Sequence, residues 1–339
     1  MLHHPPDFQP RPGQGQSPTG SDKDKRVAST WLGMQGLVPG LERIAITPGA
    51  HAAMTAILTI LTEPGDRILC ERVTYPGIRS IARRLRLDLR GVDMDADGIL
   101  PDALEEAIHD HKPQALYLNP TIQNPTTLTV PTERRLEIVE VLRHHGVPLI
   151  EDDAYGFLPP KPPAPLSCSA PELSYYIGGL AKCIGAGLRL AFVVAPSGKS
   201  TYQMGQVIHD LSVMPPPLSL GLATRWIEDG TADWIRRAIR KETAARQAMA
   251  AEILEGFDYR TTEHAFSLWM RLPEGSTRAG VIGRMAGQRL GVVASDAFTV
   301  TGAPDETVRV CLGGALDRDE LRNGLHALSN AALSQSFMG

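Results

Sequence analysis

Short apolar segments alternate with longer helical segments from residue 43 to about residue 195, and this alternation limits the fold more than any other feature. Apolar runs of four to seven residues, separated by helices of roughly 10 to 15 residues, are typical of a parallel sheet that is covered by helices on both faces. The sequence therefore predicts an α/β fold with a mostly parallel sheet. We expect strands at 43–47, 67–70, 87–92, 115–118 and 147–153, and helices at 50–61, 76–86, 102–110 and 131–145.

The pattern changes after Pro196, where Pro215–Pro217 breaks the chain and a long amphipathic helix is expected over 234–256. Before residue 28 the chain is rich in proline, glycine and charge, which is typical of an arm without a core of its own. We predict four parts, with a small α+β domain at the end: an arm and short helix at 1–40, a large domain at 41–215, linking helices at 216–245 and a small domain at 246–339. Within the small domain, strands are expected at 266–272, 291–294 and 308–312, and a helix from Arg318.

The composition of the 339 residues limits the kinds of partner. Hydrophobic residues make up 42% and charged residues 21%, and the formal net charge is −4, which gives no reason to expect nucleic acid or a membrane surface as partner. No apolar run is long enough to predict a membrane span. The four cysteines are scattered without the spacing of a disulfide framework or a zinc site, so we predict no metal site and a reducing, cytoplasmic location.

Lys182 lies between two apolar segments that both read as buried strands, within the stretch 176–196. A lysine in such a place is exposed at the strand end, is paired with an acid, or forms a covalent bond that removes its charge. A Schiff base with an aldehyde cofactor is the third of these options. The residues alone leave the three open.

Polar groups follow several of the other predicted strands. The turn Thr47–Gly49 ends a strand and opens a helix, so free backbone N–H groups there suit an anion such as a phosphate. Asn124 follows the strand at 115–118, and Asp152 and Tyr155 follow the next one. Ligands of open α/β sheets bind at the carboxyl ends of the strands, so these groups are expected to converge. The three acids at 151–153 would be costly to bury without a cationic partner.

Taken in order, these motifs resemble those of the fold-type-I pyridoxal-phosphate (PLP) aminotransferases, and most closely the aminotransferase-like domain of MocR-type bacterial regulators. The resemblance runs from about Asp7 to Leu333. It implies an α/β PLP-transferase fold with a large domain, a seven-stranded sheet and a smaller C-terminal α+β domain. The stretches that carry it are Thr47–Met54, Glu71–Gly77, Pro120–Thr126, Glu151–Tyr155 and Ala181–Arg189.

The resemblance implies roles for residues around the cofactor ring. Lys182 would form the internal aldimine with PLP and shuttle the substrate proton. Asp152 would pair with the pyridine nitrogen, which makes the ring an electron sink. Asn124 and Tyr155 would form hydrogen bonds with O3′ of the ring, and Asn124 would also lie near the substrate. Tyr75 would stack on the ring face.

It also implies roles at the two ends of the bound molecules. Arg189 and the backbone N–H groups at Ala50 and His51, after the turn at Gly49, would hold the phosphate. Arg309 would bind the α-carboxylate of the substrate. A surface arginine on a half-exposed strand is the alternative for Arg309.

The sequence departs from the family pattern at four positions. Gly179 and Ala181 stand where relatives have small hydroxyl residues, so weaker phosphate binding is expected. By the same resemblance, Phe8 matches an aromatic residue that reaches the neighbouring subunit's phosphate, and Thr127 stands where classical members have glycine. A winged-helix DNA-binding domain has no counterpart in these residues, so the chain is either a stand-alone or shortened relative or part of a longer protein.

An aminotransferase that moves an amino group between an amino acid and a 2-oxo acid is therefore the leading prediction, and a homodimer is expected by resemblance. A PLP-binding sensor with little turnover is the second, since regulators carry the closest likeness. Another PLP reaction, β-elimination or decarboxylation, is the third. In the last alternative Lys182 is a structural loop lysine and no PLP binds.

Overall fold

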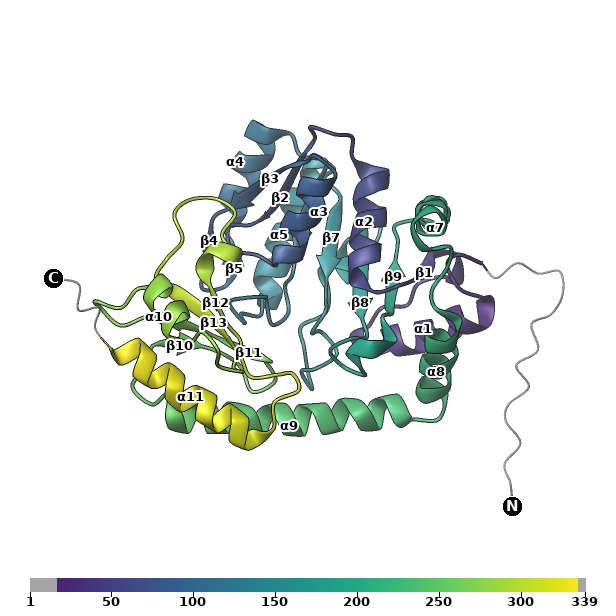
Figure 1. Cartoon of the computed structure of the whole chain (residues 1–339). Coiled ribbons are helices and arrows are strands. Elements are labelled where there is room, and N and C mark those ends of the chain that lie inside the picture. Colours follow the sequence, from purple (N-terminus) through teal and green to yellow (C-terminus); the bar gives the residue numbers. More distant parts are fainter. Residues whose placement is uncertain (1–16, 335–339) are drawn as a thin grey trace, which may run out of the picture.

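The structure, a computed structural model, describes residues 17–334. These residues form a seven-stranded sheet, a four-stranded sheet and a small two-stranded sheet of Met94–Asp95 and Gly98–Ile99, and one long helix links the two larger sheets. In Figure 1 the larger sheet and its helices lie above α9 (Thr231–Ile253), and the smaller sheet lies at the opposite end of that helix from α8 (Pro217–Glu228). None of the helices among these residues is both long and apolar enough to cross a membrane.

The larger sheet has seven strands in the order β1-β9-β8-β7-β6-β2-β3. Every neighbouring pair is parallel except the two pairs that contain β9, so β9 alone runs against the others. This confirms the predicted mostly parallel sheet. The strands are β1 (Ile44–Thr47), β2 (Arg67–Glu71), β3 (Asp88–Val92), β6 (Ala115–Leu118), β7 (Leu149–Asp152), β8 (Ser174–Gly179) and β9 (Ala191–Val194).

Both faces of this sheet are buried, because successive residues of a strand enter different cores. Ala115 and Tyr117 of β6 pack in one core with α2 (Ala50–Leu61), α3 (Pro76–Arg84) and α7 (Gly198–Ser212). Leu116 and Leu118 pack in another. That second core includes α4 (Pro101–His111), α5 (Thr132–His145) and α6 (Leu166–Ser169).

The smaller sheet is fully antiparallel, in the order β10-β11-β13-β12. The second half of α9 packs against it together with α11, which begins at an Asp317–Glu320 capping box. The remaining elements are α1 (Asp22–Leu32), β4 (Met94–Asp95), β5 (Gly98–Ile99), β10 (Tyr259–Arg260), β11 (Ser267–Arg271), α10 (Arg278–Arg284), β12 (Val292–Ala294), β13 (Thr307–Cys311) and α11 (Arg318–Leu333). Short 3₁₀ turns lie at Gly33–Gln35, Leu41–Arg43, Ala186–Leu188 and Ser295–Ala297.

Helices α6, α7 and α10 were not predicted, whereas α8 lies within the linking helices expected at 216–245. Two of the four buried positions of α7 are Thr201 and Gly205, so the apolar periodicity is weak. The proline run breaks the chain as expected, and Pro217 is the first residue of α8, where its missing N–H removes no helical bond.

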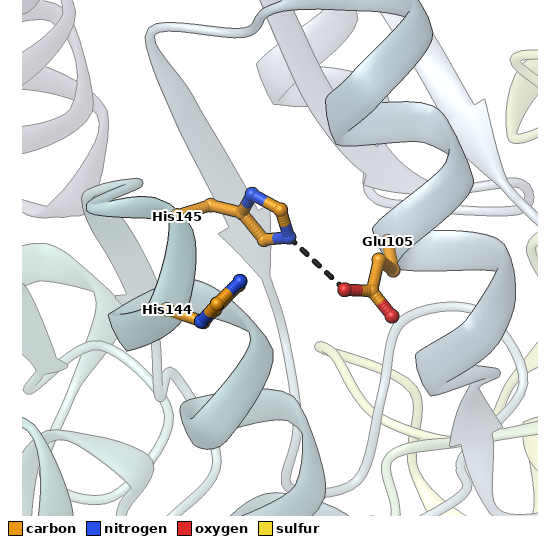
Figure 2. Close-up of side chains that lie close together, drawn as sticks. All are labelled: Glu105, His144 and His145. Atoms are coloured by element: carbon orange, nitrogen blue, oxygen red, sulfur yellow. Dashed lines mark hydrogen bonds and ion pairs between the residues drawn. The ribbon is translucent and has the colours of Figure 1, made fainter.

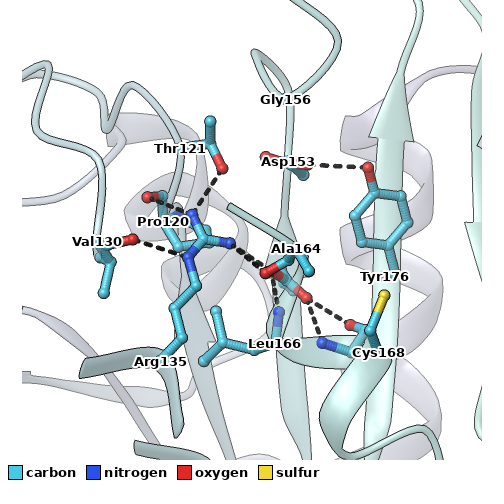
Figure 3. Close-up of polar contacts among 12 residues, drawn as sticks. Pro120, Thr121, Val130, Arg135, Asp153, Gly156, Ala164, Leu166, Cys168 and Tyr176 are labelled. Carbon is cyan, nitrogen blue, oxygen red and sulfur yellow. Dashed lines mark hydrogen bonds and ion pairs between the residues drawn. The ribbon is translucent and has the colours of Figure 1, made fainter. Parts of the chain in front are cut away.

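The acidic end of β7 has the cationic partner that its burial requires. Arg135 of α5 is itself buried, and its Nη1 lies 3.7 Å from Oε1 of Glu151. The same guanidinium donates to the carbonyls of Pro120 and Val130, so its charge is fully surrounded by acceptors (Figure 3). A buried pair that is satisfied in this way holds its position strongly, because removing one partner leaves an uncompensated charge.

Candidate active site

A cavity of about 510 Å³ lies where the large sheet faces the small one, and it brings together the residues that were predicted to form the site. All ten predicted site residues line it. They are Gly49, Ala50, His51, Tyr75, Asn124, Asp152, Tyr155, Lys182, Arg189 and Arg309. Their individual roles stay predictions.

The topology of the sheet explains why these residues meet. Strands β1, β6, β7 and β8 run in the same direction, so their carboxyl ends share one edge. Gly49 follows β1, Asn124 follows β6, Asp152 ends β7 and Lys182 follows β8. Polar side chains directly after parallel strands are thereby directed at one cavity.

Asp152 is buried, with 4% of its surface exposed, and lines the cavity. Its Oδ2 accepts a hydrogen bond of 2.8 Å from the Tyr117 hydroxyl, and its backbone carbonyl accepts from Nδ2 of Asn119. Within residues 17–334, Oδ1 has no hydrogen-bond partner. Burial raises the pKa of this carboxyl to about 6, with the Tyr117 bond acting in the opposite direction. An orphaned buried acceptor of this kind suits a cationic N–H donor from a ligand.

Lys182 carries a partly desolvated amine. Its Nζ lies 5.8 Å from the centre of the Tyr155 ring, and no acidic side chain in the described part of the chain forms an ion pair with it. Burial, followed by the charges of Arg309 and Arg189, lowers the pKa of the amine. A lowered pKa increases the neutral fraction, which is the form that attacks a carbonyl.

Two tyrosines flank the cavity. Burial raises the pKa of Tyr155 to about 12, so its phenol keeps its proton and can donate. Its ring contacts Phe266 edge to face, with 5.9 Å between the centroids. Tyr75 contacts His51 in a similar arrangement at 6.2 Å.

The N-terminus of α2 has the geometry and the positive potential that suit an anion. Gly49 has φ +92°, and a side chain at this position would bring Cβ to 3.6 Å from Nη2 of Arg189. Glycine is therefore favoured here by the positive φ of the turn, while the guanidinium lies at ordinary contact distance. The first N–H groups of a helix have no partner within the helix, so those of Ala50 and His51 add to the positive potential.

Arg309 reaches the cavity from β13 of the small sheet. Its Nη1 donates to Oδ1 of Asn124 at 2.9 Å, and its guanidinium lies 5.0 Å from the centre of the Phe298 ring. Its Nε is buried without a partner in the part of the chain that the structure describes. The small sheet thus contributes the partly buried Arg309 to the lining of the cavity, and its role toward a substrate stays a prediction.

The departures from the family pattern fall as follows. Gly179 and Ala181 line the cavity and offer no hydroxyl group. Thr127 is buried and has φ +62°, a conformation that favours glycine. Phe8 lies outside the described residues.

Sequence reasoning missed three residues around the cavity. Tyr117 was read as a strand residue and Asn119 as part of an ordinary Asn-Pro turn, yet both hydrogen-bond Asp152. Phe266 was read only as the start of a strand, and it lines the cavity. The position of Asn119 directly after a buried strand was the available signal.

A second cluster of side chains that can bind metal ions lies outside the lining of this cavity. Glu105 of α4 and His144 and His145 of α5 bring ligand atoms within 4.8 Å of one another, a geometry that could hold a metal ion (Figure 2). All three are exposed, and Nε2 of His145 is 3.2 Å from a carboxylate oxygen of Glu105. A surface ion pair at a helix C-terminus accounts for this contact.

The family model for aminotransferase class I and II matches residues 25–328. The chain is similar to the HTH-type transcriptional regulator YdeF of Bacillus subtilis, with 28% identity over 86% of the chain and 63% of the regulator. It is also similar to the 2-aminoadipate transaminase of Thermus thermophilus, with 26% identity over 94% of the chain and 80% of the transaminase. The chain therefore spans less than two thirds of the length of the regulator.

Solved structures share the fold. The α-aminoadipate aminotransferase LysN of Thermus thermophilus, solved with N-(5′-phosphopyridoxyl)-L-leucine, superposes with a TM-score of 0.83 at 24% identity. The superposition covers 94% of the chain and 83% of LysN. At this identity the likeness establishes the fold, which confirms the predicted two-domain PLP-transferase architecture.

Proposed function

The chain belongs to the class I and II aminotransferase family, and from this premise we propose that it is a PLP-dependent aminotransferase acting on an amino acid and a 2-oxo acid. One observation carries the proposal. A desolvated lysine amine, an unpartnered buried carboxylate oxygen and a helix N-terminus with an arginine converge on a single cavity.

These residues fit the cofactor. Oδ1 of Asp152 is an orphaned acceptor that a protonated ring nitrogen would satisfy. The turn at Gly49 and the guanidinium of Arg189 supply the cationic end that a phosphate needs. Lys182 would hold the aldehyde carbon, and Tyr75 and Asn124 would contact the ring.

The bound cofactor would supply an electron sink for the carbanion that forms when an amino acid loses its α-proton. The protein's own side chains position and move the proton. Lys182, once free, would take the α-proton on Nζ and return it, and its lowered pKa suits that role. Asp152 would keep the negative charge that holds the ring nitrogen protonated. Arg309 would bind the α-carboxylate, which leaves the reacting bond near Lys182.

Steady-state exchange tests this function. The holoprotein is given a panel of amino acids with 2-oxoglutarate or pyruvate, and the new amino acid is measured by chromatography. We expect ping-pong kinetics for at least one pair. Binding of amino acids with a spectral change but no exchange for any pair would instead support the sensor function that the likeness to a regulator suggests.

Arg309→Lys should raise KM for the amino acid about 10- to 100-fold, with a smaller effect on kcat. A lysine keeps the charge but loses the planar fork that binds a carboxylate through two N–H groups. Arg271→Lys is the matched control, because Arg271 lies on the neighbouring strand β11 and is exposed. Equal KM values for the two variants would contradict the assignment of Arg309.

We also propose that the protein is a cytoplasmic homodimer. Several large apolar side chains are exposed on α7, on α8 and in the turn between them, and they suit contact with a second copy. They are Tyr202, Leu211, Val213, Leu218 and Leu222.

Analytical ultracentrifugation should give twice the chain mass of 36.7 kDa. Leu218→Glu, which places a charge where 79% of the leucine is exposed in one chain, should shift the protein toward monomer. A wild-type monomer at micromolar concentration would refute the dimer.

A further inference from the structure

Glu71 ends strand β2 and is a buried carboxylate without a cationic partner. Only 3% of its surface is exposed, and it takes part in no ion pair within residues 17–334. The titratable groups that interact with it are Asp152, Tyr117 and Cys70, and none of these is a cation. Burial raises the pKa of Glu71 to about 7, while bonds from Thr74 and Asn119 oppose the shift. A charge this costly to bury is better explained by a specific role than by packing.

Both carboxylate oxygens of Glu71 accept hydrogen bonds from segments of the chain that line the cavity. Oε2 accepts from the Thr74 hydroxyl at 2.6 Å, directly before the ring-stacking Tyr75. Oε1 accepts from the backbone N–H of Asn119 at 2.9 Å. Two loops that line the site are therefore fixed by one side chain.

Asn119 extends this hydrogen-bond network to two further residues. Its Oδ1 accepts from the backbone N–H of Asn124 at 2.7 Å, and its Nδ2 donates to the backbone carbonyl of Asp152. Asn119 is 2% exposed, so each bond is shielded from water. From Glu71, a continuous chain of hydrogen bonds thus reaches the segments of Tyr75, Asn124 and Asp152.

We propose that Glu71 is a positioning residue for the cofactor: through Thr74 and Asn119 it holds three cofactor-facing segments in place, and its charge favours protonated forms of the bound cofactor. Charge-assisted bonds to a carboxylate are stronger than neutral ones, so the segments are ordered before the cofactor arrives. Above pH about 7 Glu71 is ionised, and the repulsion between its charge and that of Asp152 is then relieved when a protonated ring nitrogen binds. This inference rests on the proposed PLP chemistry.

The substitution Glu71→Gln removes the negative charge of the side chain while its size and shape are kept. The amide can still accept from Asn119 and can donate to the Thr74 oxygen, so the fold is kept. Apoprotein is titrated with PLP, and the absorbance of the complex is followed with pH. We expect binding roughly tenfold weaker. We also expect the pH at which the absorbance maximum changes to fall by about one unit, because a nearby negative charge is lost.

Two other variants distinguish positioning from general stability. Glu71→Asp keeps the charge but shortens the reach, so it should weaken PLP binding with little change in the midpoint pH. Glu151→Gln is the matched buried control, since Glu151 is a fully buried carboxylate of β7 that pairs with Arg135. It should lower Tm by several degrees, because Arg135 loses its partner, without changing the midpoint.

Wild-type PLP affinity and midpoint pH in Glu71→Gln would overturn the inference. So would changes that merely parallel a loss of Tm, as expected for Glu151→Gln. The proposed function fails by a different result, namely wild-type protein that binds no PLP or that keeps its PLP spectrum when Lys182 is replaced.

Discussion

Replacing Lys182 with alanine should lower kcat by about 10⁴-fold or more, because the variant loses both the amine that holds the cofactor and the base that moves the substrate proton. Among the described residues that line the cavity there is no second lysine, so no neighbouring amine replaces it. The visible absorbance of the holoprotein should shift to that of free PLP. After borohydride treatment, peptide mass spectrometry should find the cofactor on Lys182 of the wild type and on no lysine of the variant.

Lys241→Ala is the control, since Lys241 is exposed on α9. It should keep both the spectrum and the rate. If Lys182→Ala retained turnover within tenfold of the wild type, Lys182 would have to be a structural loop lysine.

Asp152→Asn should reduce kcat by about 10³-fold, since a neutral amide does not hold the ring nitrogen protonated. The shape of the site is preserved, because the amide oxygen can still accept from Tyr117. Single-turnover absorbance measures the loss at the chemical step. Asp153→Asn is the control, because Asp153 accepts from the Tyr176 hydroxyl and is not among the residues that line the cavity.

The same carboxylate predicts a pH dependence of cofactor binding. Burial raises the pKa of Asp152 to about 6 in the chain without cofactor, so the carboxyl is ionised above that pH and protonated below it. Only the ionised form pairs with a protonated ring nitrogen. The affinity of apoprotein for PLP should therefore fall as the pH drops below about 6, and Asp152→Asn should lack this dependence. If PLP affinity depended on pH in the same way for the wild type and for Asp152→Asn, a group other than Asp152 would have to cause the dependence.

The large domain could be read from the sequence because its signals are local. Helix α2 was predicted with its observed bounds, Ala50–Leu61, since an apolar run lies between a glycine turn and a Glu-Pro-Gly break. The long helix was predicted at 234–256 and begins earlier, at Thr231, because Gly230 adopts the left-handed conformation and opens it there. Helix ends depend on such single residues, which periodicity does not register.

Of the site, only residues that line the cavity could be predicted from the sequence. Residues at the strand ends, such as Asp152 and Lys182, follow from the topology of a parallel sheet. Their supports do not, because Asn119 bonds a residue 33 positions away and Arg135 reaches Glu151 from a helix. Which buried polar groups meet depends on how the strands are ordered in space, and the sequence does not state that order.

The most direct test of the proposed function is a half-reaction without a second substrate. Purified holoprotein is mixed with one amino acid, and the bound cofactor is quantified before and after. We expect pyridoxamine phosphate and the corresponding 2-oxo acid in a ratio of one to one per active site, with recovery of the original spectrum when a 2-oxo acid is added. A cofactor that remains PLP after incubation with every amino acid tested would contradict the assignment as an aminotransferase.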